Sequence, residues 1–355
     1  MKTLQAQDHM VYFPEQEKVF FTDLLKAKNY SSVFILVDEN TENHCLSYFQ
    51  LHYPIAIPCE IISVESGEEN KHLHTCIGIW EALSELGADR NSLLINFGGG
   101  GITDMGGYVA ACYKRGIDFI NVPTSLLAMV DASVGGKTGV DLGALKNQIG
   151  IIITPQAVII DTVFLNTLPA NEYRSGYSEM LKHGLIQDAD YWKKLADFSA
   201  ISTDTIASFI LHSVQIKQEV VNDDPYENSR RKILNFGHTL GHAIESYFLT
   251  HNDKTTLLHG EAIAIGMVLE AFISTKLLEM PLSECDEIKS VFAAIFPKVT
   301  FDADAIAAII ELLIYDKKNS HGKINFALLK AIGAPQWDVE VPGDVLHQAF
   351  DYYLA

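Results

Sequence analysis

Short apolar runs alternate with longer amphipathic stretches in the first half of the chain. Runs at 32–37, 92–97, 118–123 and 157–161 have the length and composition of buried strands. Between the first two, residues 69–86 carry apolar positions at helical spacing, and Gly87 follows as a helix stop. Strands that alternate with helices predict a parallel sheet covered by helices on both faces.

The second half has a different pattern. Helical spacing dominates there, and strand signals nearly vanish; helices are expected over 172–187, 205–221, 229–249, 261–278 and 304–315. The chain of 355 residues is long enough for two domains. We therefore predict an α/β domain over residues 1–165 and a helical, all-α domain over residues 166–355.

Composition and charge narrow the function classes. Hydrophobic residues make up 48% of the chain and charged residues 20%, which indicates a folded rather than a disordered protein. The chain has 26 Lys and Arg but 45 Asp and Glu, so its formal charge is −19. A protein this acidic repels the phosphate backbone, and nucleic acid is not expected as a partner. An anionic ligand would need a local cluster of cations.

Membrane and secretory signals are not expected either. No run of 18 apolar residues occurs, and the N-terminal sequence has no apolar signal core. The five cysteines (Cys45, Cys59, Cys76, Cys112 and Cys285) are scattered and form no C-x-x-C pair. This usage favours a reducing cytoplasm and argues against a thiolate zinc site.

Four consecutive glycines at 98–101 follow a predicted strand and precede a helix expected to start near Asp104. Glycine lets a ligand approach the backbone, and a helix N-terminus attracts a pyrophosphate. Thr103 stands where the last glycine of G-x-G-x-x-G would be, so the motif is not the usual dinucleotide fingerprint. A tight turn, with Asp104 as a helix N-cap, remains the alternative.

The segment 131–138 resembles the end of a phosphate-binding loop. However, Asp131 occupies the position of the opening glycine in G-x-x-x-x-G-K-[ST], and a carboxylate there would repel phosphates. We therefore reject a nucleotide hydrolase. Lys137, and Lys146 with Asn147, are either ligand-binding residues or ordinary surface residues.

A metal signal lies in the second half. His238 and His242 are four residues apart, on one face of a predicted helix, and His259 and Glu179 are further candidate ligands. Two histidines, a carboxylate and an open position form a catalytic zinc site. Thr239 replaces the glutamate of H-E-x-x-H, which argues against a metalloprotease, and spacing leaves open which two histidines bind the metal. Other histidines, such as His9, His72, His74 and His251, are expected to lie at the surface or to be incidental to function.

Taken together, these segments resemble 3-dehydroquinate synthases, members of the sugar-phosphate cyclase superfamily. The matching stretches span roughly residues 30 to 330: 98–107 with Asp104, Arg115-Gly116, 123–131, 135–138, 146–150, Leu168-Pro169, 179–182, 231–238, His242, 259–261 and 316–318. The order and spacing of the whole set make the resemblance specific.

The resemblance implies an N-terminal Rossmann-like NAD-binding domain, a C-terminal helical metal-binding domain and usually a homodimer. It implies NAD and a divalent metal, usually zinc, with cobalt as a possible substitute. The implied reaction belongs to the shikimate pathway and converts 3-deoxy-D-arabino-heptulosonate 7-phosphate to 3-dehydroquinate and phosphate. It proceeds by transient oxidation by NAD, β-elimination, reduction and an intramolecular aldol closure.

The resemblance also assigns residues by position. The implied metal ligands are Glu179, His238 and His259, and His242 becomes a polar neighbour of the reacting centre. Implied NAD contacts are Asp38, Glu68, Lys71, Gly99, Gly100, Gly101, Asp104, Thr124, Ser125 and Thr167. Implied substrate and catalytic contacts are Arg115, Asp131, Lys137, Lys146, Asn147, Lys182, Lys217, Arg231 and Asn235, with one of Lys317, Lys318 or Lys323.

The sequence argues against three other functions. A metal-dependent polyol or alcohol dehydrogenase has no need for so many lysines, and an NAD-binding regulatory protein has no need for Glu179, His238 and His259. A different sugar-phosphate cyclase is disfavoured because Lys146-Asn147, Arg231 and Asn235 supply the extra donors that a substrate carboxylate requires.

Overall fold

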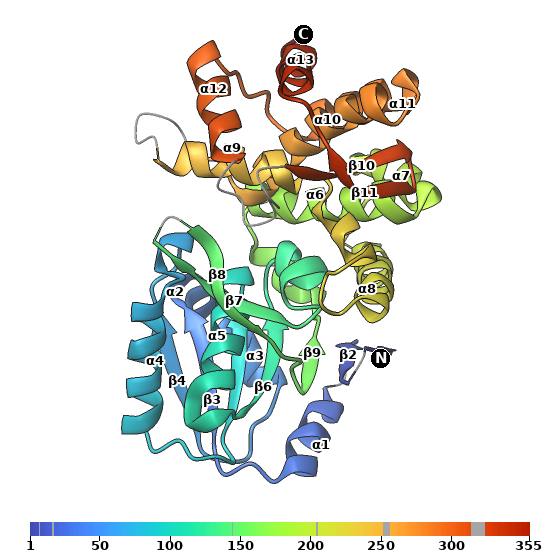
Figure 1. The fold of residues 1–355 in the computed structure, drawn as a ribbon. Coiled ribbons are helices and arrows are strands. Elements are labelled where there is room, and N and C mark those ends of the chain that lie inside the picture. The colour runs from blue at the N-terminus through green and yellow to red at the C-terminus, as the bar shows by residue number, and fades with distance from the viewer. Residues whose placement is uncertain (7, 16–17, 144, 204, 251–255, 314–323) are drawn as a thin grey trace. The chain divides into compact units, whose positions relative to one another are not determined.

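The computed structural model describes the chain except for residues 7, 16–17, 144, 204, 251–255 and 314–323. It divides into two compact units, Met1–Pro169 and Ala170–Ala355 (Figure 1). The boundary expected from the sequence, after residue 165, lies a few residues before this division. None of the described helices is long and apolar enough to cross a bilayer.

The first unit is built on a mainly parallel sheet. Among the described residues its strand order is β1-β2-β9-β6-β5-β3-β4, and only β1 runs antiparallel to its neighbour. The strands are β1 (Lys2–Gln5), β2 (Met10–Phe13), β3 (Val33–Asp38), β4 (Cys59–Val64), β5 (Leu93–Gly98), β6 (Asp118–Pro123) and β9 (Ala157–Ile159). The four strands predicted from apolar runs are therefore confirmed as β3, β5, β6 and β9, whereas β1, β2 and β4 were not predicted.

Helices cover both faces of this sheet. On one face, α4 (Leu73–Glu85) and α5 (Gly100–Cys112) pack against a core that includes Phe34, Leu94 and Phe119. On the other face, the Phe49 ring of α3 (Ser47–His52) lies 4.6 Å from the ring of Phe97 and 5.9 Å from that of Phe21 in α1 (Val19–Lys28). The α/β class of the first unit is confirmed.

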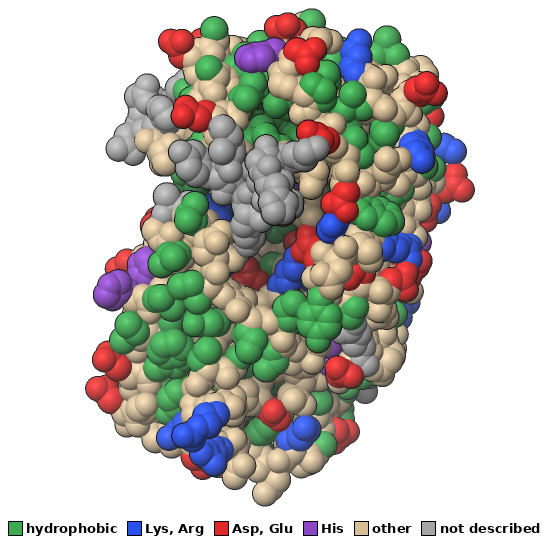
Figure 2. All heavy atoms as spheres, viewed as in Figure 1, with side chains coloured by type: hydrophobic (Ala, Val, Ile, Leu, Met, Phe, Trp, Pro, Cys, Tyr) green, Lys and Arg blue, Asp and Glu red, His purple; other side chains and the backbone are tan. Residues whose placement is uncertain are grey.

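A hairpin of β7 (Lys137–Leu142) and β8 (Leu145–Ile152) packs on α5 and was not predicted. Four of its large apolar side chains are exposed (Leu142, Leu145, Ile151 and Ile152), and apolar side chains gather in this region on the face drawn in Figure 2. An apolar surface of this kind hides the alternation that marks a half-buried strand. Because Lys137 and Thr138 open a strand and not a helix, a phosphate-binding loop is excluded here.

Short helical segments connect these elements in the first unit: α2 (Glu39–Thr41), η1 (Glu42–Leu46), η2 (Glu68–Asn70), η3 (Tyr113–Arg115), η4 (Ala128–Ala132) and η5 (Thr162–Thr167).

The second unit is mainly helical, as predicted. Its helices are α6 (Ala170–Gln187), α7 (Ala189–Ala196), η6 (Phe198–Ala200), α8 (Ile206–Asp223), η7 (Arg230–Asn235), α9 (His238–Thr250), α10 (His259–Leu277), α11 (Leu282–Ile295), α12 (Ala303–Leu312) and α13 (Gly343–Leu354). Helix α10 is buried on all sides over 262–274, apolar there except for Glu270 and Ser274, and contacts α6, α9, α11 and α13 (Figure 1). A helix that is hydrophobic all round forms the centre of a bundle.

Two expectations for this unit are wrong. A hairpin of β10 (Asn325–Ala331) and β11 (Ala334–Glu340) lies where no strands were predicted. The helix predicted over 229–249 is two elements, because Gly237, with φ +81°, turns the chain between η7 and α9.

Candidate active site

The glycine-rich turn joins β5 to α5 in the first unit. Helix α5 begins at Gly100, with Gly99 as its N-cap residue, so the start expected near Asp104 is wrong. Asp104 lies in the second turn of the helix, where it forms an ion pair with Lys71 instead of capping the helix. The N-terminal N–H groups of α5 are therefore flanked by glycines.

This turn lies at the switch point of the sheet. Strand β3 pairs with β4 on one side and with β5 on the other, so the chain goes from β3 to β4 in one direction and then crosses back past β3 to β5. Open α/β sheets bind ligands beyond the carboxyl ends of strands at such a point. Asp38 ends β3 there, and its Oδ1 accepts a hydrogen bond from the N–H of Thr41 at 2.7 Å. Thr124 and Ser125 follow β6, and the N–H of Thr124 donates to the carbonyl of Gly98 at 2.9 Å.

Packing explains some of the glycines near the turn but not all of them. A Cβ at Gly106 would lie 2.0 Å from Oδ1 of Asn96, so the fold itself requires glycine at that position. A Cβ at Gly101 would meet nothing within 4 Å, and one at Gly99 would meet only Ser125, at 3.6 Å or more. Gly99 and Gly101 leave open backbone that a ligand can approach, which fits a pyrophosphate at the start of α5.

A charged network lies beside the turn. The Lys71 ammonium is 2.7 Å from Oδ2 of Asp104, 2.8 Å from Oδ1 of Asn147 and 4.0 Å from Oε1 of Glu68. The ammonium of Lys146 lies 3.4 Å from the same Glu68 oxygen. The structure thus joins Lys71 and residues of η2, α5 and β8 into one group, although the resemblance assigned them partly to NAD and partly to substrate.

Burial and charge shift two pKa values in this network. Burial alone would lower the pKa of Lys71, but the carboxylates of Asp104 and Glu68 outweigh it and raise that pKa above its usual value. Burial raises the pKa of Asp104, and Lys71 only partly offsets this effect. Lys71 is therefore a permanent cation in this group.

The remaining predicted residues of the first unit are more dispersed. Asp131 lies in η4 and contributes to the raised pKa of Asp104, Lys137 is exposed at the start of β7, and Thr167 ends η5. Arg115 is exposed beyond the C-terminal end of α5, a helix of 13 residues. That length places it roughly 20 Å from the glycine-rich turn, so it does not join the others within this unit.

A carboxylate and three imidazoles meet in the second unit. Nitrogens of His238, His242 and His259 all lie within 4.8 Å of one another. Oε1 of Glu179, on α6, lies 3.5 Å from Nε2 of His238 and 4.0 Å from Nε2 of His259. Glu179 also forms an ion pair with Lys182, one turn further along α6. The metal candidates from three separate helices are thus brought together.

These residues fit a divalent metal. Glu179 is fully buried, and its carboxylate lies against the Lys182 ammonium on one oxygen and Nε2 of His238 and His259 on the other. A buried carboxylate that faces two imidazole nitrogens provides the His₂Glu donor set of a catalytic zinc site.

The predicted anion-binding residues of the second unit are largely buried. The side chains of Lys182, Lys217 and Arg231 are at most 6% exposed. Arg231 donates through Nη1 to the carbonyl of Pro225 at 2.6 Å, and Asn235 hydrogen-bonds to Glu227. The three alternatives for a substrate-binding lysine near the end of the chain all lie outside the described residues: Lys317, Lys318 and Lys323.

Two family models match the chain, 3-dehydroquinate synthase N-terminal over residues 61–175 and 3-dehydroquinate synthase C-terminal over residues 176–319. A curated 3-dehydroquinate synthase from Parabacteroides distasonis is 41% identical over 333 residues, 93% of this chain and 94% of that protein. The chain belongs to the 3-dehydroquinate synthase family. Another member, from Sulfurovum, is 42% identical over 77% of each chain.

Solved structures agree with the family. A 2-deoxy-scyllo-inosose synthase, described as complexed with carbaglucose-6-phosphate, NAD+ and Co2+, has a TM-score of 0.86 and 26% identity, with 98% of this chain and 99% of that chain covered. An iron-containing alcohol dehydrogenase has a TM-score of 0.67 and 14% identity over 100% and 99% of the two chains, which shows a shared fold alone.

Two buried carboxylates that were not predicted lie beside the predicted site of this 3-dehydroquinate synthase family member. Glu245 lies on α9 and contacts His259, whereas Asp224 accepts hydrogen bonds from the N–H groups of Asn228, Ser229 and Arg231. A signal existed for Glu245, since positions 238, 242 and 245 share one helix face. No periodicity marks Asp224, which acts through a loop.

Two of the histidines for which no functional role was predicted have structural positions. His9 is buried, and burial lowers its pKa to about 4. His72 is the N-cap of α4, where its Nδ1 accepts from the N–H of Thr75 at 3.2 Å. His251 lies outside the described residues.

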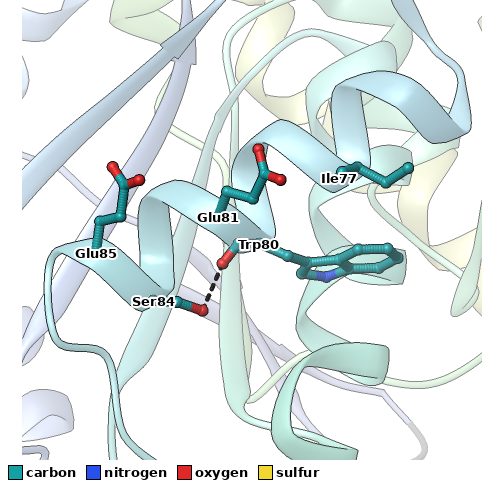
Figure 3. A pocket seen from close by; sticks show the side chains of 5 residues that line it. All are labelled: Ile77, Trp80, Glu81, Ser84 and Glu85. Carbon is teal, nitrogen blue, oxygen red and sulfur yellow. Dashed lines mark hydrogen bonds between the residues drawn. The ribbon is translucent and has the colours of Figure 1, made fainter.

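A hollow of about 340 Å³ on α4 is separate from the residues above. It is lined by Ile77, Trp80, Glu81, Ser84 and Glu85, all from this one helix (Figure 3). With two glutamates and no cation in its lining, it does not suit an anionic substrate.

Proposed function

We propose that this chain acts as a 3-dehydroquinate synthase, converting 3-deoxy-D-arabino-heptulosonate 7-phosphate to 3-dehydroquinate and inorganic phosphate, a step of the shikimate pathway. Beside the family membership, one observation carries the proposal: the buried Glu179 carboxylate faces Nε2 of both His238 and His259. Such a site suits a reaction in which negative charge develops on a substrate oxygen.

We propose Glu179, His238 and His259 as the ligands of one divalent metal, with zinc as the expected ion. The nucleotide would be NAD, bound at the glycine-rich turn by the residues that the resemblance assigns. The open backbone at Gly99 and Gly101 supports this site, as does the position of Asp38 and Ser125 at the switch point. When bound, these groups supply Lewis acidity at a substrate oxygen and a transient hydride acceptor.

The chain's own residues bind and orient the anionic substrate. Lys182, Lys217 and Arg231 are buried cations of the second unit, and charge-assisted hydrogen bonds from such groups hold a carboxylate or a phosphate firmly. Asn235, held by Glu227, adds a neutral donor. In the first unit, Lys71 keeps Asp104 and Asn147 in place while Lys146 presents a further ammonium.

His242 and the departing phosphate are the groups proposed to act on the substrate's protons. His242 lies beside both proposed ligands, with its ring centroid 5.2 Å from that of His238 and 5.7 Å from that of His259. We assign it to hydrogen bonding with the reacting part of the substrate. Because the departing phosphate can accept the proton that β-elimination releases, a dedicated base is not required.

Phosphate release from the heptulosonate phosphate tests the proposal directly. Release should require NAD, stop with a chelator and return with zinc, and no NADH should accumulate. Stoichiometric NADH from a polyol would instead identify a dehydrogenase. Faster phosphate release from a hexose 6-phosphate than from the heptulosonate phosphate would identify another sugar-phosphate cyclase.

We also propose a cytoplasmic homodimer without nucleic-acid or membrane partners. The negative charge and the five cysteines, none in a disulfide, support this assignment. A second copy would also explain how Arg115, remote from the turn of its own chain, could contact substrate. Light scattering at working concentration should give twice the chain mass of 39.3 kDa, and a monomeric active enzyme would exclude the dimer.

A further inference from the structure

Glu245 is a buried carboxylate that does not belong to the site residues implied by the resemblance. It lies on α9, one turn beyond His242 and two turns beyond His238, so the three side chains share one face of the helix. Only 4% of Glu245 is exposed. Its Oε2 lies 3.3 Å from Nδ1 of His259, the first residue of α10.

The His259 ring is therefore placed between two carboxylates. Nδ1 faces Glu245 at 3.3 Å, and Nε2 faces Oε1 of Glu179 at 4.0 Å. A neutral imidazole that donates from Nδ1 has its lone pair on Nε2. The contact with Glu245 thus selects the tautomer in which Nε2 can bind a cation beside Glu179.

His238 has a corresponding arrangement with a different acceptor. Its Nδ1 lies 3.2 Å from the backbone carbonyl of Phe236, and its Nε2 lies 3.5 Å from the same Glu179 oxygen. Both imidazoles therefore present Nε2 to Glu179 while an oxygen atom faces Nδ1. For His238 the acceptor is backbone, whereas for His259 it is a side chain that mutation can remove.

We propose that Glu245 is a positioning residue that fixes the tautomer and the orientation of His259 for metal binding. The inference rests on the metal site proposed above. A carboxylate that accepts from the second nitrogen of a ligating histidine also raises the basicity of the nitrogen that binds the metal. Loss of such a partner typically weakens metal binding about 10- to 100-fold.

The test is the zinc affinity of the metal-free protein, measured by competition with a chromophoric chelator. Glu245→Gln keeps the shape and one acceptor oxygen but loses the charge, so its Kd should rise about 10-fold. Glu245→Ala removes the acceptor, and its Kd should rise up to about 100-fold. Ser246→Ala, on the same helix, is the matched control and should bind zinc as the wild type does.

Two further measurements separate positioning from general stability. The visible spectrum of the Co2+-loaded protein should change in Glu245→Gln and not in Ser246→Ala, because only the former alters the environment of a ligand. Urea unfolding of the metal-free chains reports any structural role. A lowered unfolding midpoint with unchanged zinc Kd in both Glu245 variants would overturn the proposal.

The zinc content of the wild type separates failure of the proposed metal site from failure of the role proposed for Glu245. If the wild type binds no zinc, the proposed metal site and this inference fail together. If it binds one zinc per chain and the Glu245 variants match it, this inference fails alone.

Discussion

Glu270 of α10 binds the start of α9 through the backbone N–H of Gly237. Its Oε2 accepts from that N–H at 2.6 Å, and its Oε1 accepts from the N–H of Leu240 at 3.1 Å. Glu270 is fully buried, and this side chain from a neighbouring helix caps the start of α9, because Gly237 before the helix has no side chain that could do so. The contact links the helix that begins with His238 to the helix that begins with His259.

Glu270→Ala should lower the free energy of unfolding by roughly 2–6 kcal/mol, because two buried N–H groups lose their acceptor at about 1–3 kcal/mol each. Glu270→Gln retains one acceptor oxygen and should lose about half as much. Urea unfolding of both variants measures the effect, with exposed Glu85→Gln as a control that stays near wild type. Equal stability of Glu270→Ala and wild type would show that the cap is dispensable.

The glycines of α5 allow fold and ligand binding to be separated. Gly106→Ala should destabilise the protein by about 1–3 kcal/mol, since its Cβ would collide with the buried Asn96 side chain. Gly101→Ala meets open space, so its unfolding curve should match the wild type. Its NAD Kd, measured by calorimetry, should nevertheless rise about 10-fold or more, because the added methyl group occupies space for the ligand. Unchanged NAD affinity in Gly101→Ala would place the nucleotide elsewhere.

The pattern of apolar positions predicted much of the fold. Buried parallel strands such as β3 and β5 are largely continuous apolar runs, and amphipathic helices such as α8 and α12 carry apolar positions at helical spacing. The β7–β8 hairpin was missed because its apolar side chains point partly to solvent, and β10–β11 because a two-stranded hairpin has little periodicity of its own.

The site was predictable to different degrees in its parts. The histidine spacing of α9 and the glycines after β5 are local signals of chemistry, so they could be read from the sequence. The helix starts at Gly100 and His238 could not be read in this way. Asp104 looks like a helix cap in the sequence but pairs with the distant Lys71, and α9 is capped by Glu270 from another helix. Carboxylates that act through a neighbour, such as Glu245, carry no motif.

Asp224 should make the stability of the second unit depend on acidic pH. Burial raises its pKa, but the N–H groups of Ser229, Asn228 and Arg231 outweigh this effect and hold the pKa below its ordinary value of 3.8. A carboxylate with a lowered pKa in the folded state stabilises the fold above its unfolded pKa and loses that effect as the pH falls through its folded pKa.

Asp224→Asn should therefore reduce the free energy of unfolding at neutral pH by on the order of 2 kcal/mol, the loss expected for hydrogen bonds to a charged group. The difference from wild type should begin to shrink below about pH 3.8, where Asp224 of the unfolded chain takes up a proton, and should vanish as the pH falls through the lower pKa of the folded state. Urea unfolding at a series of pH values measures both. A difference that stays constant down to strongly acidic pH would contradict a charged Asp224.

The three histidines should differ in metal content. His238→Ala and His259→Ala each remove an imidazole whose Nε2 faces Glu179, so purified protein should hold close to no zinc. His242→Ala should retain about one zinc per chain while phosphate release falls, since we place this residue beside the substrate. Atomic absorption after dialysis gives the metal content. Full zinc occupancy in His259→Ala would refute the proposed ligand set.

Lys146 offers a test of anion binding in the first unit. Its ammonium lies 3.4 Å from Glu68, in the group that also holds Lys71 and Asp104. A charge-assisted hydrogen bond to a bound anion is worth about 1.5–3 kcal/mol, so Lys146→Ala should lower kcat/KM roughly 10- to 100-fold. The loss would be larger if the contact strengthens in the transition state.

NAD and zinc affinities of Lys146→Ala should stay close to wild type, because the proposed ligands of both remain. Lys114→Ala, an exposed lysine beyond the far end of α5, is the control for the loss of one positive charge. Since a chain of charge −19 attracts a phosphate ester only where its cations are concentrated, a wild-type kcat/KM in Lys146→Ala would remove this lysine from the substrate site.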